Sequence, residues 1–131
     1  MDKPVISLEK YEVDEINFSR TLTDEDKENG EVFDVNFSGG LTEDEKYGKV
    51  TISVTCLDKE TFRKVTVTVS GYFLLNDTEN IKEYLIVNGS AIIFPYVRSI
   101  LSMVTSFDSE TAVLIPTVNI LDIMKDKSES K

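Results

Sequence analysis

Strict alternation of apolar and polar residues in three separate runs is the feature that most constrains the fold of this chain. The runs are EVFDVNFS (31–38), KVTISVTC (49–56) and KVTVTVSGYF (64–73). Successive side chains of a β-strand point to opposite faces, so each run has one apolar and one polar face. Valine, isoleucine, threonine and phenylalanine predominate, as is typical of strands. The sequence therefore predicts half-buried strands joined by polar turns.

A fourth, less regular strand is predicted before these runs, over residues 6–18. Its apolar positions change parity twice, and such changes predict β-bulges; they are Ile6, Leu8, Tyr11, Val13, Ile16 and Phe18. Together the four segments predict an antiparallel meander with one apolar face. The opposite face is polar and consists mostly of threonine, serine and asparagine.

The pattern changes to a helical one after residue 76. Ile81, Tyr84 and Leu85 predict a short helix that ends at Asn88-Gly89, and a longer helix is expected from Ser90 to about Ser106. The predicted fold class is α+β: a four-stranded sheet, a long apolar helix and a short C-terminal helical segment. One domain is expected over residues 1–131, with flexible ends at about 1–4 and 125–131.

The long helix is apolar on two sides. One stripe, which covers the sheet, consists of Ile93, Val97, Ile100, Leu101 and Val104, and the other consists of Ile92, Tyr96, Met103 and Phe107. A helix that is apolar on two sides is buried on two sides. Either the C-terminal segment or a second subunit can cover the second stripe, and we favour a subunit interface formed by Ile92, Tyr96, Met103 and Phe107.

A single charged residue, Arg98, lies between Tyr84 and Phe107. The segment is long enough to span a bilayer. A central arginine costs on the order of 3 kcal/mol there, and Pro95 and Asn88 add to this cost, so membrane insertion is disfavoured. In a folded protein we expect the Arg98 guanidinium to be held in a buried pair.

Composition excludes several classes of function. The net charge of −10 and the pI of about 4.4 disfavour nucleic acid and anionic membranes as partners. The chain has no histidine, and its one cysteine, Cys56, lies in a strand pattern, so neither an imidazole base nor a thiol–imidazole pair is available. The acidic runs at 24–28 and 43–45 do not fit a calcium loop. No enzyme activity, metal or cofactor is predicted, and the N-terminus lacks a signal core, so a cytoplasmic location is expected.

Four short motifs resemble those of the SecB protein-export chaperone family. They are EINF (15–18) in the first strand, SGYF (70–73) at the end of the fourth, FPYVR (94–98) in the long helix and PTVN (116–119) after it. Their order and spacing agree from about Ile6 to Met124. The resemblance implies a homotetramer, a dimer of dimers whose helices pack between eight-stranded sheets, with neither cofactor nor catalysis.

The resemblance also implies that unfolded polypeptides bind in long hydrophobic grooves. The groove candidates are Phe73, Leu74, Leu75, Tyr84, Leu85, Phe94 and Val113. Contacts to the SecA motor would fall near Glu15, Ser19, Lys64 and Thr66, of which Glu15 alone is acidic. The expected function is a chaperone that holds unfolded or partly folded polypeptides, as in protein export. The alternative is a dedicated binding or adaptor protein, for example a chaperone for an antitoxin, that does not engage SecA.

Overall fold

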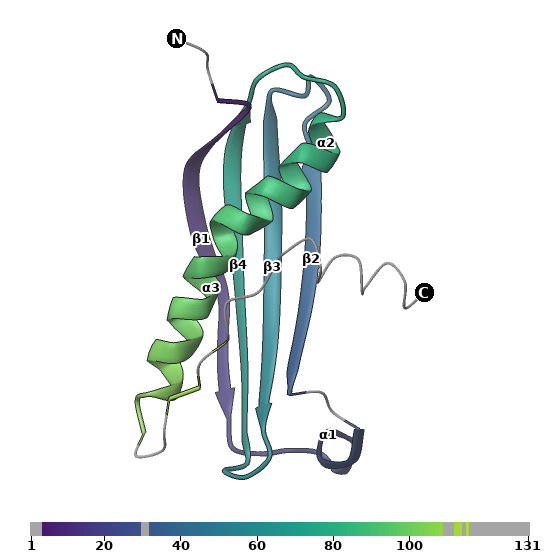
Figure 1. Cartoon of the computed structure of the whole chain (residues 1–131). Coiled ribbons are helices and arrows are strands. Elements are labelled where there is room, and N and C mark those ends of the chain that lie inside the picture. The colour runs from purple at the N-terminus through teal and green to yellow at the C-terminus, as the bar shows by residue number, and fades with distance from the viewer. Residues whose placement is uncertain (1–3, 30–31, 109–111, 114, 116–131) are drawn as a thin grey trace.

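The computed structural model describes residues 4–29, 32–108, 112–113 and 115. The strands are β1 (Ile6–Ser19), β2 (Phe33–Leu41), β3 (Tyr47–Asp58) and β4 (Arg63–Leu75), and a short helix α1 (Asp24–Asn29) lies between the first two (Figure 1). After β4 come α2 (Ile81–Tyr84), a π-helical segment η1 (Leu85–Gly89) and α3 (Ser90–Thr105). The α+β class and the order of sheet and helix are as predicted.

All four strands are antiparallel, in the spatial order β1-β4-β3-β2. The last three strands form the predicted meander. The first strand departs from it, because β1 pairs with β4 and not with β2, which is a Greek-key order. The connection that contains α1 runs along one end of the sheet and carries the chain from one edge to the other (Figure 1). This connection, predicted as a plain polar loop, contains α1, whose start is capped by reciprocal hydrogen bonds between Thr23 and Asp26.

Both bulges predicted in the first strand are present. The register of β1 against β4 shifts between Leu8 and Lys10 and again between Val13 and Glu15. The extra residues keep Tyr11, Val13, Ile16 and Phe18 on the same face as the apolar residues of β4.

The two faces of the sheet differ as the alternation predicts. One carries the core side chains, including Val50, Ile52, Val54, Val65, Val67, Val69 and Phe73, all buried. The other carries hydroxyl groups that are paired across β3 and β4: Thr51 with Ser70 at 2.8 Å, Ser53 with Thr68 at 2.9 Å and Thr55 with Thr66 at 3.0 Å. We call this second side the open face.

The predicted break between two helices is wrong. Asn88 and Gly89 lie in η1, and α2, η1 and α3 form one continuous helix of 25 residues. The Asn88 side chain donates to the Tyr84 carbonyl at 3.0 Å, and Gly89 keeps right-handed helical angles. Gly89 serves a close approach to the sheet, since a β-carbon there would lie 2.9 Å from Cγ2 of Val50. By length and composition alone the continuous helix is apolar enough to span a bilayer, a test that the core helices of soluble proteins also pass.

Glycines allow the helix to lie close against the sheet. A β-carbon at Gly48 would lie 2.4 Å from Leu85, and one at Gly71 would lie 2.4 Å from Cδ1 of Ile93. Leu85 and Ile93 are fully buried. The helix therefore crosses the sheet diagonally over positions that lack side chains (Figure 1).

The buried guanidinium belongs to Arg63 at the start of β4, whereas Arg98 is half-buried. Arg63 donates to the carbonyl of Thr105 in the last turn of α3, to Asp58 and to Thr61, each at 2.9 Å, and also contacts Asp108. A cation at a helix C-terminus satisfies an unpaired carbonyl and complements the helix dipole. Arg63 thus ties the end of α3 to the β3–β4 turn.

Two ionisable groups near Arg63 have shifted pKa values. Burial on its own would raise the pKa of Asp58, but hydrogen bonds from Thr61 and Arg63 lower it to about 2. Burial, together with the negative charge of Asp58, raises the pKa of the Cys56 thiol to about 11. Cys56 is a buried, protonated strand residue at neutral pH, as its pattern predicts.

Replacing Gly71 with valine should destabilise the protein by about 2 kcal/mol, because the added side chain overlaps the buried Ile93. Thermal or chemical denaturation measures the change. Gly40→Ala is the matched control, since a β-carbon at Gly40 would meet no atom within 4 Å. Equal stability of the two variants would contradict the close helix–sheet contact.

The stabilising effect of Asp58 should depend on pH. Its folded pKa of about 2 lies below the ordinary value of about 3.9, so the stabilisation is complete above that value and is lost as the pH falls towards 2. At pH 7 we expect Asp58→Asn to lower the free energy of unfolding by about 1–2 kcal/mol. Chemical denaturation from pH 7 to pH 2 should show the two proteins converging. A difference independent of pH would contradict this assignment.

Candidate functional site

The helix is too narrow to cover the whole sheet. An α-helix with its side chains is about 10–12 Å wide, whereas the axes of four strands span roughly 14 Å, without counting side chains. The interior strands β3 and β4 therefore carry the fully buried residues of the core, and the outer strands β1 and β2 do not. The two sides of the helix offer two candidate surfaces.

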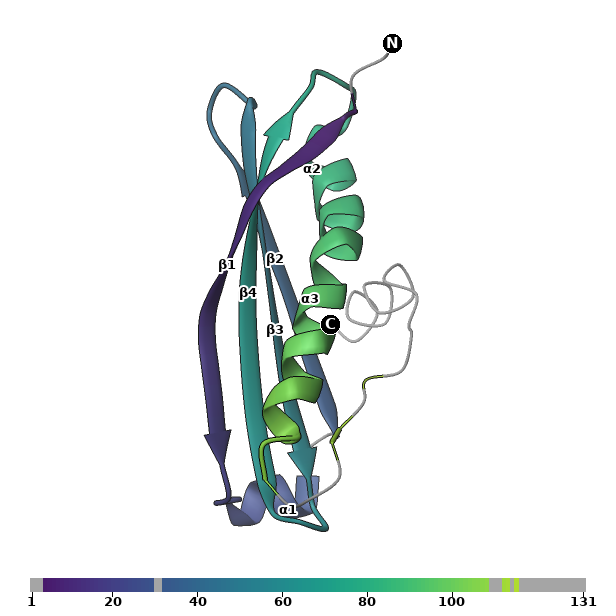
Figure 2. The same ribbon diagram turned by 90° about the vertical axis from the view of Figure 1, so that its left-hand side faces the viewer.

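The first candidate, the β1 surface, consists of apolar side chains on β1 and on the outer side of α3. The residues are Tyr11, Val13, Ile16 and Phe18 of β1 with Ile92, Tyr96, Met103 and Phe107 of the helix segment. The rings of Tyr11 and Tyr96 stack with centroids 4.2 Å apart and join the two elements. Beyond this contact the lower half of β1 bows away from α3 (Figure 2).

The four residues predicted as an oligomer interface all lie on this surface. Met103 is 58% exposed and Phe107 74% exposed, Ile92 is also exposed, and Tyr96 is half-buried. Whether a second subunit covers them stays a prediction. The contribution of β1 is not evident from the sequence, because alternation shows which residues share a face and not which strand lies at the edge of the sheet.

The second candidate, the β2 edge, is the free side of β2 together with its row of apolar side chains. β2 hydrogen-bonds to β3 alone within the described sheet. Its nine residues pair without a register shift and include one charged side chain, Asp34. Phe33, Val35 and Phe37 face the core side but are only half-buried. A regular edge with few charges is a template on which another strand can pair.

A surface hollow lies beside this edge at the start of the helix. It has a volume of about 500 Å³ and is lined by Asn80, Lys82, Glu83, Ile86 and Val87. Ile86 packs over β2, since a β-carbon at Gly39 would lie 3.0 Å from its Cγ1 atom. The hollow therefore places apolar side chains next to the end of the β2 edge.

The seven groove candidates are not brought together on one surface. Phe73, Leu75, Leu85 and Phe94 are buried in the core of the chain, and Leu74 is half-buried on the open face. Tyr84 is exposed on α2. Val113 is half-buried, and its amide donates to Oγ1 of Thr105 at 2.8 Å. Their role in binding stays a prediction, and PTVN (116–119) lies outside the described residues.

The four positions expected to contact SecA do lie together on the open face. Ser19 pairs with Lys64 and Asn17 pairs with Thr66, while Glu15, two residues from Asn17, pairs with Thr68. Lys64 forms an ion pair with Asp26 at 3.4 Å, and Thr66 is bonded to Thr55. Glu15 is exposed and is the one carboxylate among the four. This group of side chains therefore carries little of the negative charge that the resemblance would require.

The acidic runs of the sequence lie in α1 and in the β2–β3 turn. In the part of the chain that the structure describes, no three cysteine, aspartate or glutamate side chains lie close enough together to hold a metal ion. Asp26 caps α1, and Asp44 accepts hydrogen bonds from Thr42 and from the amide of Lys46. These carboxylates stabilise local turns.

No protein-family model matches the chain. An uncharacterized protein of Methanocaldococcus jannaschii, MJ0357, is 29% identical over 86 residues, which are 61% of this chain and 56% of that protein. This chain thus spans about half the length of that relative.

Two solved structures are similar in fold. One is the SecB-like chaperone Rv1957 of Mycobacterium tuberculosis in complex with a ChAD peptide from the Rv1956 HigA1 antitoxin, with a TM-score of 0.63 and 13% identity over 86% of this chain and 90% of that one. The other, of unknown function, comes from Streptococcus agalactiae, with a TM-score of 0.54 and 14% identity over 86% and 97% of the two chains. This chain therefore has the fold of a SecB-like chaperone.

Proposed function

We propose that the protein is a dedicated SecB-like chaperone that holds one short segment of a partner polypeptide along the β2 edge. The observation that supports this proposal is the edge itself: nine regularly paired residues, whose outer side pairs with no strand among the described residues, next to the half-buried Phe33, Val35 and Phe37. An added strand gains main-chain hydrogen bonds, and its alternate side chains contact the apolar row. The chain needs neither a catalytic group nor a cofactor for this activity.

The length of the edge favours a short segment over a long unfolded chain. Nine residues in a strand span about 30 Å. Four of the seven side chains that a longer groove would use are buried within the protein. A holding surface of this size suits the recognition of one segment, which is the property of an adaptor.

One of the two similar structures supports a chaperone for a single segment. The SecB-like chaperone Rv1957 binds a peptide from an antitoxin, and a disordered segment of an antitoxin is the class of client that we propose here. The alternative, a general chaperone for export through SecA, gains less support, because Glu15 is the one carboxylate at the four positions where the resemblance places SecA contacts.

We further propose that a second copy of the chain covers the β1 surface. Contiguous exposed apolar side chains usually mark an interaction site. A symmetric dimer requires one self-complementary patch, and the β1 surface is apolar on both of its elements. Direct pairing of two β1 strands is disfavoured, since β1 has two bulges and five charged residues between Glu9 and Glu15. The contact is therefore expected between side chains, and not through the strand pairing that would join two four-stranded sheets into the eight-stranded sheets that the resemblance implies.

Replacing Met103 with aspartate should dissociate the oligomer, because a carboxylate would be buried in the apolar contact. Light scattering should show the mass falling towards the 14.8 kDa of one chain, with unchanged strand content by circular dichroism. Ala91→Asp is the control, on a helix position that is exposed but outside the β1 surface. A Met103→Asp protein with the wild-type mass would contradict the assignment.

Replacing Phe37 with glutamate should weaken binding of a strand-forming peptide by about tenfold or more, because it places a charge in the apolar row of β2. The neighbouring Ser38→Glu puts the same charge on the open face and should bind as the wild type does. Calorimetry with a peptide of alternating valine and threonine measures both, and thermal denaturation checks that each variant is folded.

An aggregation assay separates a dedicated chaperone from a general one. At equal molar amounts, the protein should not suppress the aggregation of several unrelated unfolded proteins. Suppression of all of them would favour the general holding chaperone. Failure of the wild type to bind any strand-forming peptide would contradict the role of the β2 edge.

A further inference from the structure

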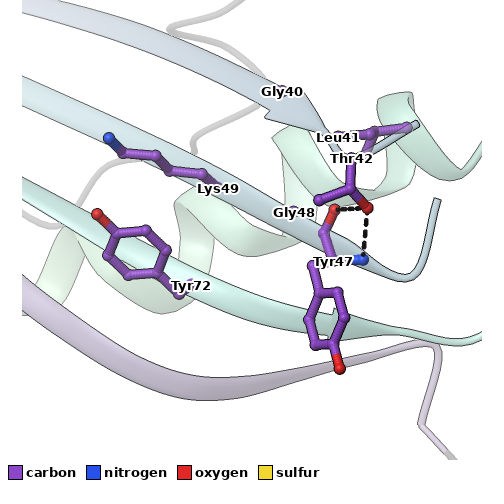
Figure 3. Close-up of a pocket in the computed structure, with 7 residues that line it drawn as sticks. All are labelled: Gly40, Leu41, Thr42, Tyr47, Gly48, Lys49 and Tyr72. Atoms are coloured by element: carbon purple, nitrogen blue, oxygen red, sulfur yellow. Dashed lines mark hydrogen bonds between the residues drawn. The ribbon is translucent and has the colours of Figure 1, made fainter. Parts of the chain in front are cut away.

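A second hollow lies on the open face, on the side of the sheet away from the helix, and two of its lining residues, Gly40 and Leu41, are the last residues of β2. Its volume is about 280 Å³ (Figure 3). One row of residues that line the hollow crosses β2, β3 and β4 and consists of Gly40, Lys49 and Tyr72. Tyr47 lies at one end of the hollow. A β-carbon at Gly40 would meet no atom within 4 Å. The missing side chain of Gly40 therefore leaves part of this space open.

Aromatic rings and ammonium groups surround the hollow. The Tyr72 ring has Nζ of Lys10 at 5.0 Å from its centroid and Nζ of Lys49 at 5.5 Å. The Tyr72 hydroxyl donates to Glu12 at 3.2 Å, which fixes the ring, while Tyr47 is 52% exposed. Figure 3 shows the Lys49 side chain and the Tyr72 ring beside one another on neighbouring strands, with the Tyr47 ring farther along, beyond Gly48.

Lys49 contributes a positive charge beside the hollow. The hydrogen bond from Lys10 and, to a smaller extent, this charge lower the pKa of Glu12. Lys10 is paired with Glu12 at 3.0 Å, but Lys49 forms no ion pair with any described residue. Its electrostatic complement is a carboxylate that lies close to a bound apolar group.

We propose that this hollow binds an aromatic side chain from an acidic linear segment of a partner protein. A phenylalanine or tyrosine ring fits the volume and can stack offset or edge-to-face on Tyr47 and Tyr72. A carboxylate next to that ring in the partner's sequence pairs with Lys49. Single-stranded nucleic acid also offers rings next to negative charge, but its continuous phosphate backbone requires a row of cations, and of the two lysines at the Tyr72 ring Lys10 is already paired with Glu12.

The test is a titration of the isotopically labelled full-length protein, followed by amide chemical shifts in nuclear magnetic resonance. The probe is a glycine–serine peptide with an Asp-Phe-Asp centre. We expect saturable shifts at Gly40, Gly48 and Lys49, with a dissociation constant on the order of 0.1–1 mM. Peptides with Asp-Ala-Asp and Lys-Phe-Lys centres separate the contributions of the ring and of the charges, and each should bind about tenfold more weakly or not at all.

Three variants locate the site. Lys49→Glu reverses the charge and should weaken binding about tenfold, whereas Lys59→Glu, in the β3–β4 turn at the other end of the sheet, should leave it unchanged. Gly40→Leu fills the open space and should abolish the binding. The proposal is overturned by an absence of saturable shifts, by equal binding of the Asp-Ala-Asp peptide, by undiminished binding to Gly40→Leu, or by tighter binding of a short oligodeoxythymidylate. Because the Phe37 side chain lies on the opposite face of β2 from the hollow, Phe37→Glu should leave this titration unchanged.

Discussion

The close contact between one helix and a sheet wider than itself determines the rest of this structure. Gly48 and Gly71 on the sheet and Gly89 on the helix remove the side chains that would keep the two layers apart. Leu85 and Ile93 fill the space and are fully buried. A helix this close to β3 and β4 covers those two strands well, and it cannot also cover the outer two. Both candidate functional surfaces follow from this arrangement.

The two outer strands differ in a way that suits different partners. β1 has two bulges and many charges, and its apolar face is joined to α3 by the stacked rings of Tyr11 and Tyr96. β2 has a regular edge that pairs with no strand in the described part of the chain, and it has a single charged residue. Side-chain contacts with a second copy suit the first strand, and main-chain pairing with a held segment suits the second. Arg63 donates hydrogen bonds to Thr105 at the end of α3 and to Asp58 at the end of β3. These bonds fix the end of the helix relative to the sheet, and with it the position of one surface relative to the other.

Alternation predicted the strands, their faces and the two bulges, because period and parity are local properties of the sequence. The order of the strands depends on a connection that crosses one end of the sheet, which no local pattern encodes. Asn88-Gly89 indicated a helix end, but there Gly89 serves contact with Val50. Similarly, Arg98, the one charged residue of the apolar helix, was predicted to be buried, whereas the buried guanidinium is that of Arg63 at the start of β4. Side chains such as Phe73 and Phe94, proposed for a groove from resemblance, are buried in the core of this chain.

Hydrogen exchange of the full chain with and without a bound strand-forming peptide shows whether a held segment pairs with the β2 edge. If the segment pairs with the β2 edge, amides of residues 33–41 should exchange more slowly in the complex, and so should those near Ile86 at the adjoining hollow. Amides of β1 should keep their rates. Protection confined to β1 and the outer side of α3 would place the held segment on the β1 surface and contradict this account.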